Sequence, residues 1–271
     1  TDGSTGTLDG AQKNTGLGHE VFDDLTSGVS NTAIGYLTLT KNTTGSSNVA
    51  IGNNALGANT TGASNIGIGS GALDANTEGD ANTAVGASAY TTGTTGDNNT
   101  AIGRSALSAN TTGASNTAVG CGALIANTTA NNNVAVGMCA MLATTTGANN
   151  TAVGFSALDT NTTGCENVAV GRDTMFTGTT ACRSVAVGYR ALKAVTTGDL
   201  NTAVGYHVLT ANTTGTCNVA VGISALVANT TGNNNVAIGF CANATAVDRN
   251  DNTAIGFEAL KVNTAIGNTA V

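Results

Sequence analysis

The feature that most constrains the fold of this chain is a seventeen-residue repeat that runs through almost all of it. The unit consensus is NTAVGxxALxANTTGxx, and position numbers below refer to this unit. Strong copies of its first five residues begin, always at the same interval, at Asn31, Asn48, Asn65, Asn82, Asn99, Asn116, Asn133, Asn150, Asn167, Ser184, Asn201, Asn218, Asn235 and Asn252. The register extends back to Asn14, where NTGLG is a weakened copy, which makes fifteen units. Spacing without insertion or deletion is typical of repeats that stack on one another.

Each unit contains one short segment with the alternation of a β-strand. Positions two and four are β-branched, with Ala or once Gly between them, and this period of two favours a strand. A second apolar segment at positions eight and nine precedes an Asn-Thr-Thr-Gly turn. One such unit cannot bury its apolar face alone. We therefore predict an all-β fold, a parallel β-solenoid (β-roll) of fifteen 17-residue coils.

The same register predicts how the chain is divided. Residues 1–13 are expected to form a polar N-terminal segment, and residues 14–271 to form the solenoid. The first coil, 14–30, and the last, 252–271, are degenerate copies of the unit. Asparagines that recur in register are expected to form amide ladders between coils, because buried polar groups need hydrogen-bond partners.

We expect the Val or Ile at position four and the Leu at position nine to point into the coil, since burial of large aliphatic side chains stabilises a fold. A slip of one residue would turn them outward, which explains the invariant spacing. The predicted core ladder consists of Ile34, Ile51, Ile68, Val85, Ile102, Val119, Val136, Val153, Val170, Val187, Val204, Val221, Ile238 and Ile255.

Positions three and five, which are Ala and Gly, would then face away from the core. A strip of small side chains lets another backbone approach closely. We expect this strip, which includes Ala118, Ala135, Ala152 and Ala169, to be an intersubunit face, most simply at the axis of a parallel homotrimer or fibre. The alternative is that these residues only face solvent.

Composition excludes several classes of function. Charged residues are 9% of the chain, with 16 acidic against 9 basic side chains and a net charge of −7, so no basic patch is expected to bind nucleic acid. The apolar residues, 41%, are too interrupted for a membrane span. Neither GxGxxG, GxxxxGK nor HExxH is present. We expect no enzyme activity, and accordingly no catalytic residue, cofactor or metal site.

The six cysteines contain no CxxC pair. Cys165 and Cys182 share position sixteen of adjacent units, and coils about 4.8 Å apart would bring them within reach of a disulfide. A disulfide between them is one interpretation, and free thiols are the other. Sequons such as Asn59 and Asn212 belong to the turn consensus, so glycosylation would need a secretory origin.

The unit resembles the NTAIGYQAL and NTTG arrays of phage tail-fibre proteins and of bacterial surface proteins with tail-fibre domains. The best matching segments run from Asn31 to Tyr36, from Ser184 to Leu192 and from Asn201 to Tyr206. More distantly, Asn48 to Gly52 is similar to the NSVAIG motif in the head repeats of trimeric autotransporter adhesins. The resemblance implies a trimeric β-solenoid fibre, exposed outside the cell or on a virion.

These observations favour a non-catalytic structural fibre protein, a rigid extracellular, cell-surface or virion rod used for attachment. Its expected partners are itself, as a homotrimer or an end-to-end filament, and a cell-surface receptor. Continuation is expected at the C-terminal side because Ile266 and Val271 would leave an apolar strand edge open. The alternative is an ice-binding or other repetitive-surface binding module. The recurrent Thr-Thr pair suits it poorly, because adjacent strand residues face opposite ways.

Overall fold

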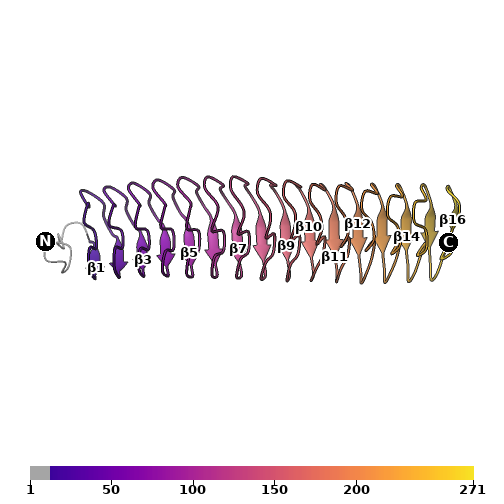
Figure 1. The fold of residues 1–271 in the computed structure, drawn as a ribbon, viewed down its shortest axis with the longest axis horizontal. Helices are drawn as coiled ribbons and strands as arrows, with labels where there is room; N and C mark the ends of the chain where they lie inside the picture. The colour runs from indigo at the N-terminus through magenta and orange to yellow at the C-terminus, as the bar shows by residue number, and fades with distance from the viewer. Residues whose placement is uncertain (1–12) are drawn as a thin grey trace. The chain divides into compact units, whose positions relative to one another are not determined.

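A computed structural model describes residues 13–271 of the chain, so the predicted N-terminal segment lies outside the described residues except for Lys13. The chain divides into two compact units, Thr1–Asn133 and Val134–Val271, each of which we describe by itself. In both, every coil contributes one strand that pairs in parallel with the strand of the next coil (Figure 1). The described residues form 16 strands and no helix. This confirms the prediction of an all-β, parallel β-solenoid with about fifteen turns.

The strands are three residues long, except the last, which has two. Those of the first unit are β1 (Thr15–Leu17), β2 (Thr32–Ile34), β3 (Val49–Ile51), β4 (Ile66–Ile68), β5 (Thr83–Val85), β6 (Thr100–Ile102) and β7 (Thr117–Val119). Those of the second unit are β8 (Val134–Val136), β9 (Thr151–Val153), β10 (Val168–Val170), β11 (Val185–Val187), β12 (Thr202–Val204), β13 (Val219–Val221), β14 (Val236–Ile238), β15 (Thr253–Ile255) and β16 (Thr269–Ala270).

Within each unit the pairing register equals the sequence period. Thr32 pairs with Val49, the equivalent residue of the next repeat, so one repeat is one coil. The last coil differs, because Thr269 pairs with Thr253 and the coil between them is one residue shorter than the repeat. The segment from Asn263 to Gly267 reads NTAIG but forms no strand, since it takes the place of the Asn-Thr-Thr-Gly turn. The place of a motif within the coil, and not the motif alone, therefore decides whether it becomes a strand.

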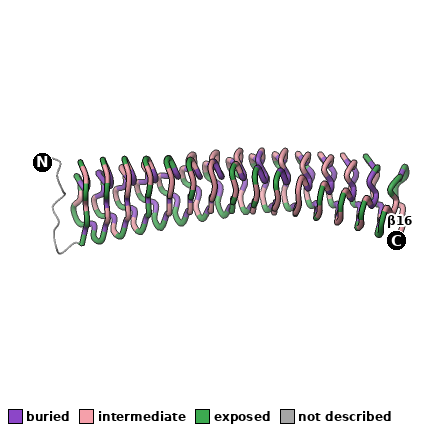
Figure 2. Tube along the Cα trace, turned by 90° about the horizontal axis from the view of Figure 1, so that it is seen from below, coloured by how far each residue is buried: buried purple, intermediate pink, exposed green. Residues whose placement is uncertain are grey.

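The predicted direction of the strand residues is wrong. In every strand from β2 to β15 the middle residue is buried and the outer two are not (Figure 2). The predicted intersubunit strip, Ala118, Ala135, Ala152 and Ala169, is fully buried in the core. The predicted core ladder lies on the outside, and its members are Ile34, Ile51, Ile68, Val85, Ile102, Val119, Val136, Val153, Val170, Val187, Val204, Val221, Ile238 and Ile255.

The narrow cross-section of the coil explains this reversal. The prediction that position nine points inward is confirmed, and Leu56, Leu107 and Leu226 are completely buried. A Cβ atom added to Gly67, at position three, would lie 3.4 Å from Cγ and 3.5 Å from Cδ1 of Leu56. That is contact distance for a methyl group, and a closely packed interior has no further space there. Position three therefore accepts Ala, and the larger β-branched residues lie outside.

The predicted asparagine ladders are confirmed, and the ladder at position one closes each coil. The Asn31 side chain donates from Nδ2 to the Gly45 carbonyl at 2.9 Å, which joins the end of the coil to its start. Its Oδ1 accepts from the backbone N–H of Asn48 at 2.9 Å, which joins it to the next coil. One amide thus satisfies a buried donor and a buried acceptor that the turn would otherwise leave unpaired.

A second ladder runs through position twelve and is interrupted. Asn59 Nδ2 donates to Asn42 Oδ1, and Asn76 Nδ2 donates to Asn59 Oδ1, both at 2.8 Å. The next coil has Gly93 at this position, and Asn76 Oδ1 is a buried acceptor without a partner. Because these asparagines also form the sequons, and Asn59 and Asn212 are 0% exposed, the folded coil does not present them for glycosylation.

The interruption at Gly93 accommodates a tyrosine in the core. Tyr90 replaces Leu at position nine, is fully buried, and has its pKa raised to about 12, chiefly by burial. Its hydroxyl donates to the Gly96 carbonyl at 3.2 Å and accepts from Asn99 Nδ2 at 3.0 Å. A Cβ atom at Gly93 would overlap the Tyr90 ring. The ring therefore takes the space of the missing asparagine.

This arrangement predicts strong coupling between Tyr90 and Gly93. Gly93→Asn should destabilise the first unit by a steric clash, and Tyr90→Leu by an unfilled cavity, each by roughly 2 kcal/mol or more. The double variant restores the consensus between Asn76 and Asn110 and should recover most of the loss. A double-mutant cycle on the urea unfolding free energy measures this. Additive losses would contradict the account.

Candidate functional site

In each unit the outward strand residues form a continuous apolar surface, which we call the strand face. It comprises positions two and four of every coil, and both positions are only Thr, Val or Ile from β2 to β15. Val134 and Val136 are each 36% exposed, and Ile34 is 37% exposed. No charged residue occurs on this face in those strands. Exposed apolar residues in one contiguous patch, unlike scattered ones, are typical of an interaction surface.

Position six, at the corner after the strand, differs between the two units. In the first unit it is mostly small or polar, with Tyr36, Asn53, Ser70, Ala87, Arg104 and Cys121. In the second unit it is large and mostly apolar, with Met138, Phe155, Arg172, Tyr189, Tyr206, Ile223, Phe240 and Phe257. Six of these eight are more than 40% exposed apolar or aromatic residues: Met138, Phe155, Tyr206, Ile223, Phe240 and Phe257.

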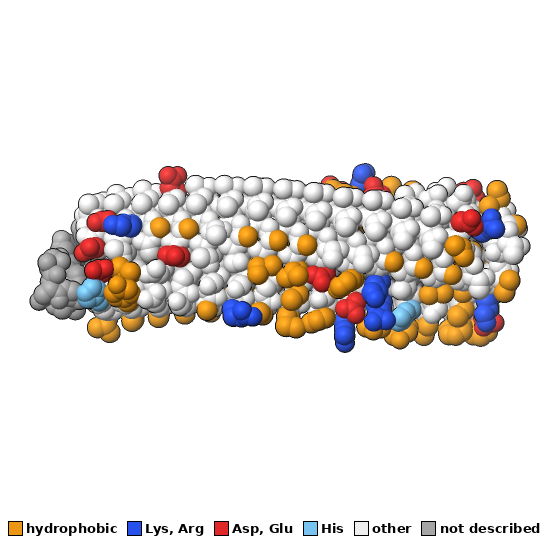
Figure 3. All heavy atoms as spheres, viewed as in Figure 1, with side chains coloured by type: hydrophobic (Ala, Val, Ile, Leu, Met, Phe, Trp, Pro, Cys, Tyr) orange, Lys and Arg blue, Asp and Glu red, His pale blue; other side chains and the backbone are white. Residues whose placement is uncertain are grey.

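Aromatic and basic side chains gather at this corner in three successive coils. We call Arg172, Tyr189, Arg190, Lys193, Tyr206 and His207 the aromatic–basic cluster. The Tyr189 and Tyr206 rings stack with centroids 5.4 Å apart and an angle of 25° between their planes. His207 lies 4.4 Å from the Tyr206 centroid. Figure 3 shows basic, acidic and histidine side chains beside hydrophobic ones on this stretch of an otherwise sparsely charged surface.

The basic groups of the cluster lie against rings. The Arg190 guanidinium is 4.9 Å from the Tyr189 centroid, within the range of a cation–π contact. Its Nε lies 3.6 Å from Asp173 Oδ2, an ion pair without a hydrogen bond, and this buried Nε has no hydrogen-bond partner. Burial first, and then the charges of Arg190 and Lys193, lower the pKa of His207. The local potential around His207 is therefore positive, although the chain is acidic overall.

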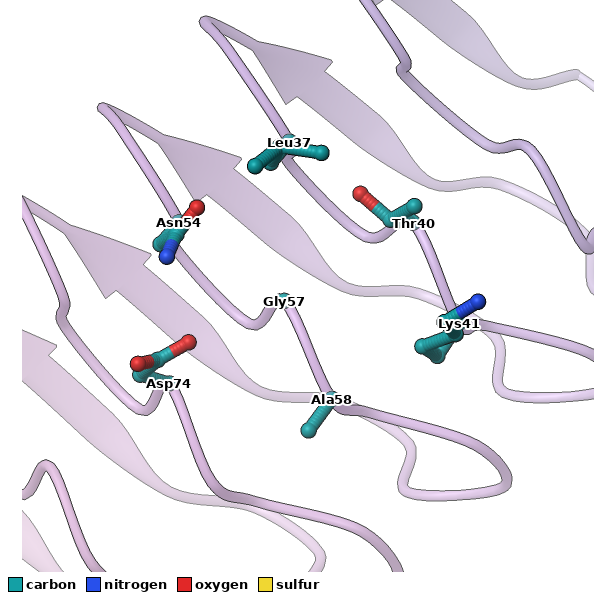
Figure 4. A pocket seen from close by; sticks show the side chains of 7 residues that line it. All are labelled: Leu37, Thr40, Lys41, Asn54, Gly57, Ala58 and Asp74. Atoms are coloured by element: carbon teal, nitrogen blue, oxygen red, sulfur yellow. The ribbon is translucent and has the colours of Figure 1, made fainter.

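A depression of about 230 Å³ lies in the first unit, above Gly57 (Figure 4). It forms because glycine interrupts the column at position ten between Thr40 and Asp74. Partial burial raises the pKa of Asp74, while the Lys41 ammonium is already paired with Asp24 at 3.1 Å. The side chains in Figure 4 line a shallow surface and do not converge on one point. The depression is therefore hollow enough for a small ligand, but its polar groups do not converge to bind one.

The structure brings Cys165 and Cys182 together, as their shared column predicted. Their Sγ atoms lie 2.8 Å apart, and both residues are free thiols. The contact with Cys182, followed by burial, raises the pKa of Cys165 to about 11. A protonated thiol is a poor nucleophile, so this contact lowers the reactivity of Cys165. The disulfide between them stays a prediction.

No group of three or more His, Cys, Asp or Glu side chains is placed to hold a metal ion in residues 13–271. Over the same residues, no helix has the length and apolar character that crossing a membrane requires.

Sequence reasoning missed the aromatic–basic cluster because its residues occupy the variable positions six, seven and ten of the repeat. A consensus sequence does not show variable positions, and the three parts of the cluster, at residues 172, 189–193 and 206–207, come from three successive repeats. Reading each variable position as a column through successive coils would have aligned Arg172, Tyr189 and Tyr206 at position six. The sequence therefore does contain evidence for the cluster, but only in the residues that depart from the repeat consensus.

Comparison with known proteins adds no assignment, since no family model and no curated protein matches the chain.

Proposed function

We propose that this chain is a non-catalytic structural fibre protein, which acts outside the cell or on a virion and packs against further copies of itself. The observation that carries the proposal is the uncharged strand face, repeated without interruption from β2 to β15. The resemblance of the repeat to tail-fibre arrays supports an extracellular, cell-surface or virion location and a role in attachment.

Each coil builds its core from its own residues and its neighbours', so the strand face is not needed to complete the fold. Ala at position three, Leu at position nine and the two asparagine ladders fill and close the interior. The Val and Ile residues outside are therefore available for a partner. Their β-branched side chains are stiff at χ1, so packing them costs little conformational entropy.

A second copy of this chain fits the strand face better than an unrelated protein. Strands of stacked coils are about 4.8 Å apart, and a surface with the same rib spacing can interdigitate with it. In the second unit alone, eight strands from β8 to β15 each present two outward side chains, sixteen in all. Two copies of a chain with a net charge of −7 repel each other, and this repulsion is weakest where they meet through the strand face, which carries no charge.

Lysines on the strand face are expected to dissociate the assembly. The variant Val136→Lys, Val153→Lys, Val170→Lys places three charges in successive coils of the second unit, where like-charge repulsion and desolvation oppose contact with another copy. The coil itself should melt within a few degrees of the original chain, because exposed substitutions usually change stability by less than about 0.5 kcal/mol each. Light scattering gives the assembly mass, and circular dichroism the melting.

The matched control carries three lysines on another side of the same coils, at Thr146, Thr163 and Thr180, which are exposed at position fourteen. This control should keep the assembly of the original chain. Self-packing through the strand face is refuted by a monomeric original chain, or by an assembly that survives the valine substitutions.

One observation favours a second candidate, a module that binds ice or another repetitive surface. Positions two and four place spaced pairs, such as Thr83 with Val85 and Thr100 with Ile102, on one face of successive coils. The turn threonines are less suitable, because the hydroxyls of Thr43 and Thr60 donate to carbonyls of the next coil. Thermal hysteresis that the valine-to-lysine variant abolishes would favour this candidate over self-packing.

A further inference from the structure

We propose that the aromatic–basic cluster of the second unit binds an acidic polysaccharide, a linear sugar polymer that carries carboxylates. The proposal rests on the attachment role suggested above and names the class of ligand for it. It concerns position six and its neighbours, and not the strand face at positions two and four.

Basic residues are scarce in this chain and are concentrated here. Four of the nine lysines and arginines fall within residues 172–193, and three of these four belong to the cluster. None of the three belongs to the asparagine ladders at positions one and twelve. Among the described residues no carboxylate forms an ion pair with the Lys193 ammonium, which lies 5.9 Å from the centroid of the Phe176 ring. The Lys193 charge is thus available to an outside anion, whereas Arg172 and Arg190 share one carboxylate, that of Asp173, at 3.6 Å from each Nε.

Two tyrosine rings of the cluster stack on each other, which leaves mainly their hydroxyl-bearing edges for contact with a ligand. Tyr189 and Tyr206 lie 5.4 Å apart in adjacent coils, and Tyr206 is 53% exposed. An aromatic ring with a hydroxyl at its edge combines an apolar surface with a hydrogen-bonding group. The hydroxyls of a sugar ring can bond to these polar edges while its C–H groups contact the ring surface that stays exposed.

Arginine and lysine next to the rings supply the charge recognition. The planar guanidinium forms paired hydrogen bonds with a carboxylate, which an ammonium cannot do. The Arg190 side chain is 35% exposed, but its Nε is buried 3.6 Å from Asp173 Oδ2, so only the terminal N–H groups of the guanidinium can reach an outside carboxylate. A carboxylate on a bound sugar would complete this arrangement above the Tyr189 ring.

The pairing of a ring with a cation repeats along the coils, which favours a polymer over a small ligand. Arg172 lies 5.4 Å from the Phe155 ring, Arg190 lies 4.9 Å from Tyr189, and Lys193 lies 5.9 Å from Phe176. Successive coils repeat about every 4.8 Å, so these three pairs extend over neighbouring coils and offer an extended ligand more than one contact.

Acidic sugar fits this cluster better than single-stranded nucleic acid. Bases would also stack on the tyrosines, but nucleic acid binding depends on neutralising many phosphates. Here only three basic side chains are present, and Asp173 lies among them.

The test measures binding of the full chain to polygalacturonate, to neutral dextran and to oligothymidylate, by titration calorimetry at low salt. We expect binding to polygalacturonate alone, weakened by added salt. Two double variants, Tyr189→Ala with Tyr206→Ala and Arg190→Gln with Lys193→Gln, should each lower the affinity at least tenfold. The matched control is Tyr36→Ala, since Tyr36 occupies the same position, is 47% exposed and lies 5.5 Å from the His19 ring. This control should bind as the original chain does.

Equal binding of dextran, preferential binding of oligothymidylate, absence of polygalacturonate binding, or equal losses in the control would each overturn the proposal. Circular dichroism melting of every variant verifies that the coil is intact, and Lys193→Gln alone is the mildest change should a double variant melt early. Light scattering of the same samples separates the two proposals. An intact assembly that does not bind the polymer refutes only the ligand, and a binding monomer refutes only the self-packing.

Discussion

Replacing Ala152 by Asp is expected to unfold coils of the second unit, with a loss of about 3–5 kcal/mol, because the new carboxylate would be buried without a partner. Ala152 is the middle residue of β9 and is 0% exposed. The interior there accepts a methyl group, so the larger side chain adds a steric cost to the electrostatic one. Urea unfolding followed by circular dichroism gives the change in free energy.

The neighbouring residue provides the control. Val153→Asp places the same group on the same strand, but Val153 is 37% exposed and its carboxylate would stay in water. We expect a loss below about 1 kcal/mol for it. Both variants should be compared in dilute samples, because an assembly through the strand face would add its own stability. Equal losses, or a larger loss for Val153→Asp, would mean that Val and Ile at position four form the core after all.

Replacing Gly103 by Ala is expected to cost on the order of 3 kcal/mol, since two separate features of the backbone exclude a side chain. Gly103, at position five, has a φ of +131°, a conformation that is accessible almost only to glycine. A Cβ atom would also lie 2.6 Å from the carbonyl oxygen of Gly120 in the next coil. Thermal and urea unfolding measure the loss.

A substitution at Gly256 distinguishes the conformational cost from the steric cost. Its φ of +126° is similar, but no atom lies within 4 Å of the Cβ that alanine would add. Gly256→Ala should therefore show the conformational cost alone and a smaller loss than Gly103→Ala. If the two losses are the same, the close approach of successive coils does not explain the glycine at position five.

Some positions have backbone conformations that no sequence pattern indicated. Positions seven, nine and seventeen adopt positive φ in successive coils, and the residue at position nine is usually leucine, as in Leu56 with φ of +51° and Leu107 with +55°. This region is unfavourable for a side chain such as leucine. It is stabilised by the stack, because the Leu56 N–H donates to the Ala72 carbonyl of the next coil at 3.0 Å. The conformation thus depends on neighbours that lie a whole coil away.

The sequence by itself determined the period, and with it the coil length, the parallel register and the asparagine ladders, because each of these follows from identical residues placed at one constant interval. It also determined that Leu at position nine is inside. Only the tertiary structure decided which side of the strand faces the core, since an alternation of large and small residues reads the same from either face. The cross-section of the coil makes that choice: once Leu56 fills it, a methyl group fits opposite and Val or Ile does not. Tertiary structure also brought Tyr206 against Tyr189, because only stacking makes neighbours of residues that are a coil apart.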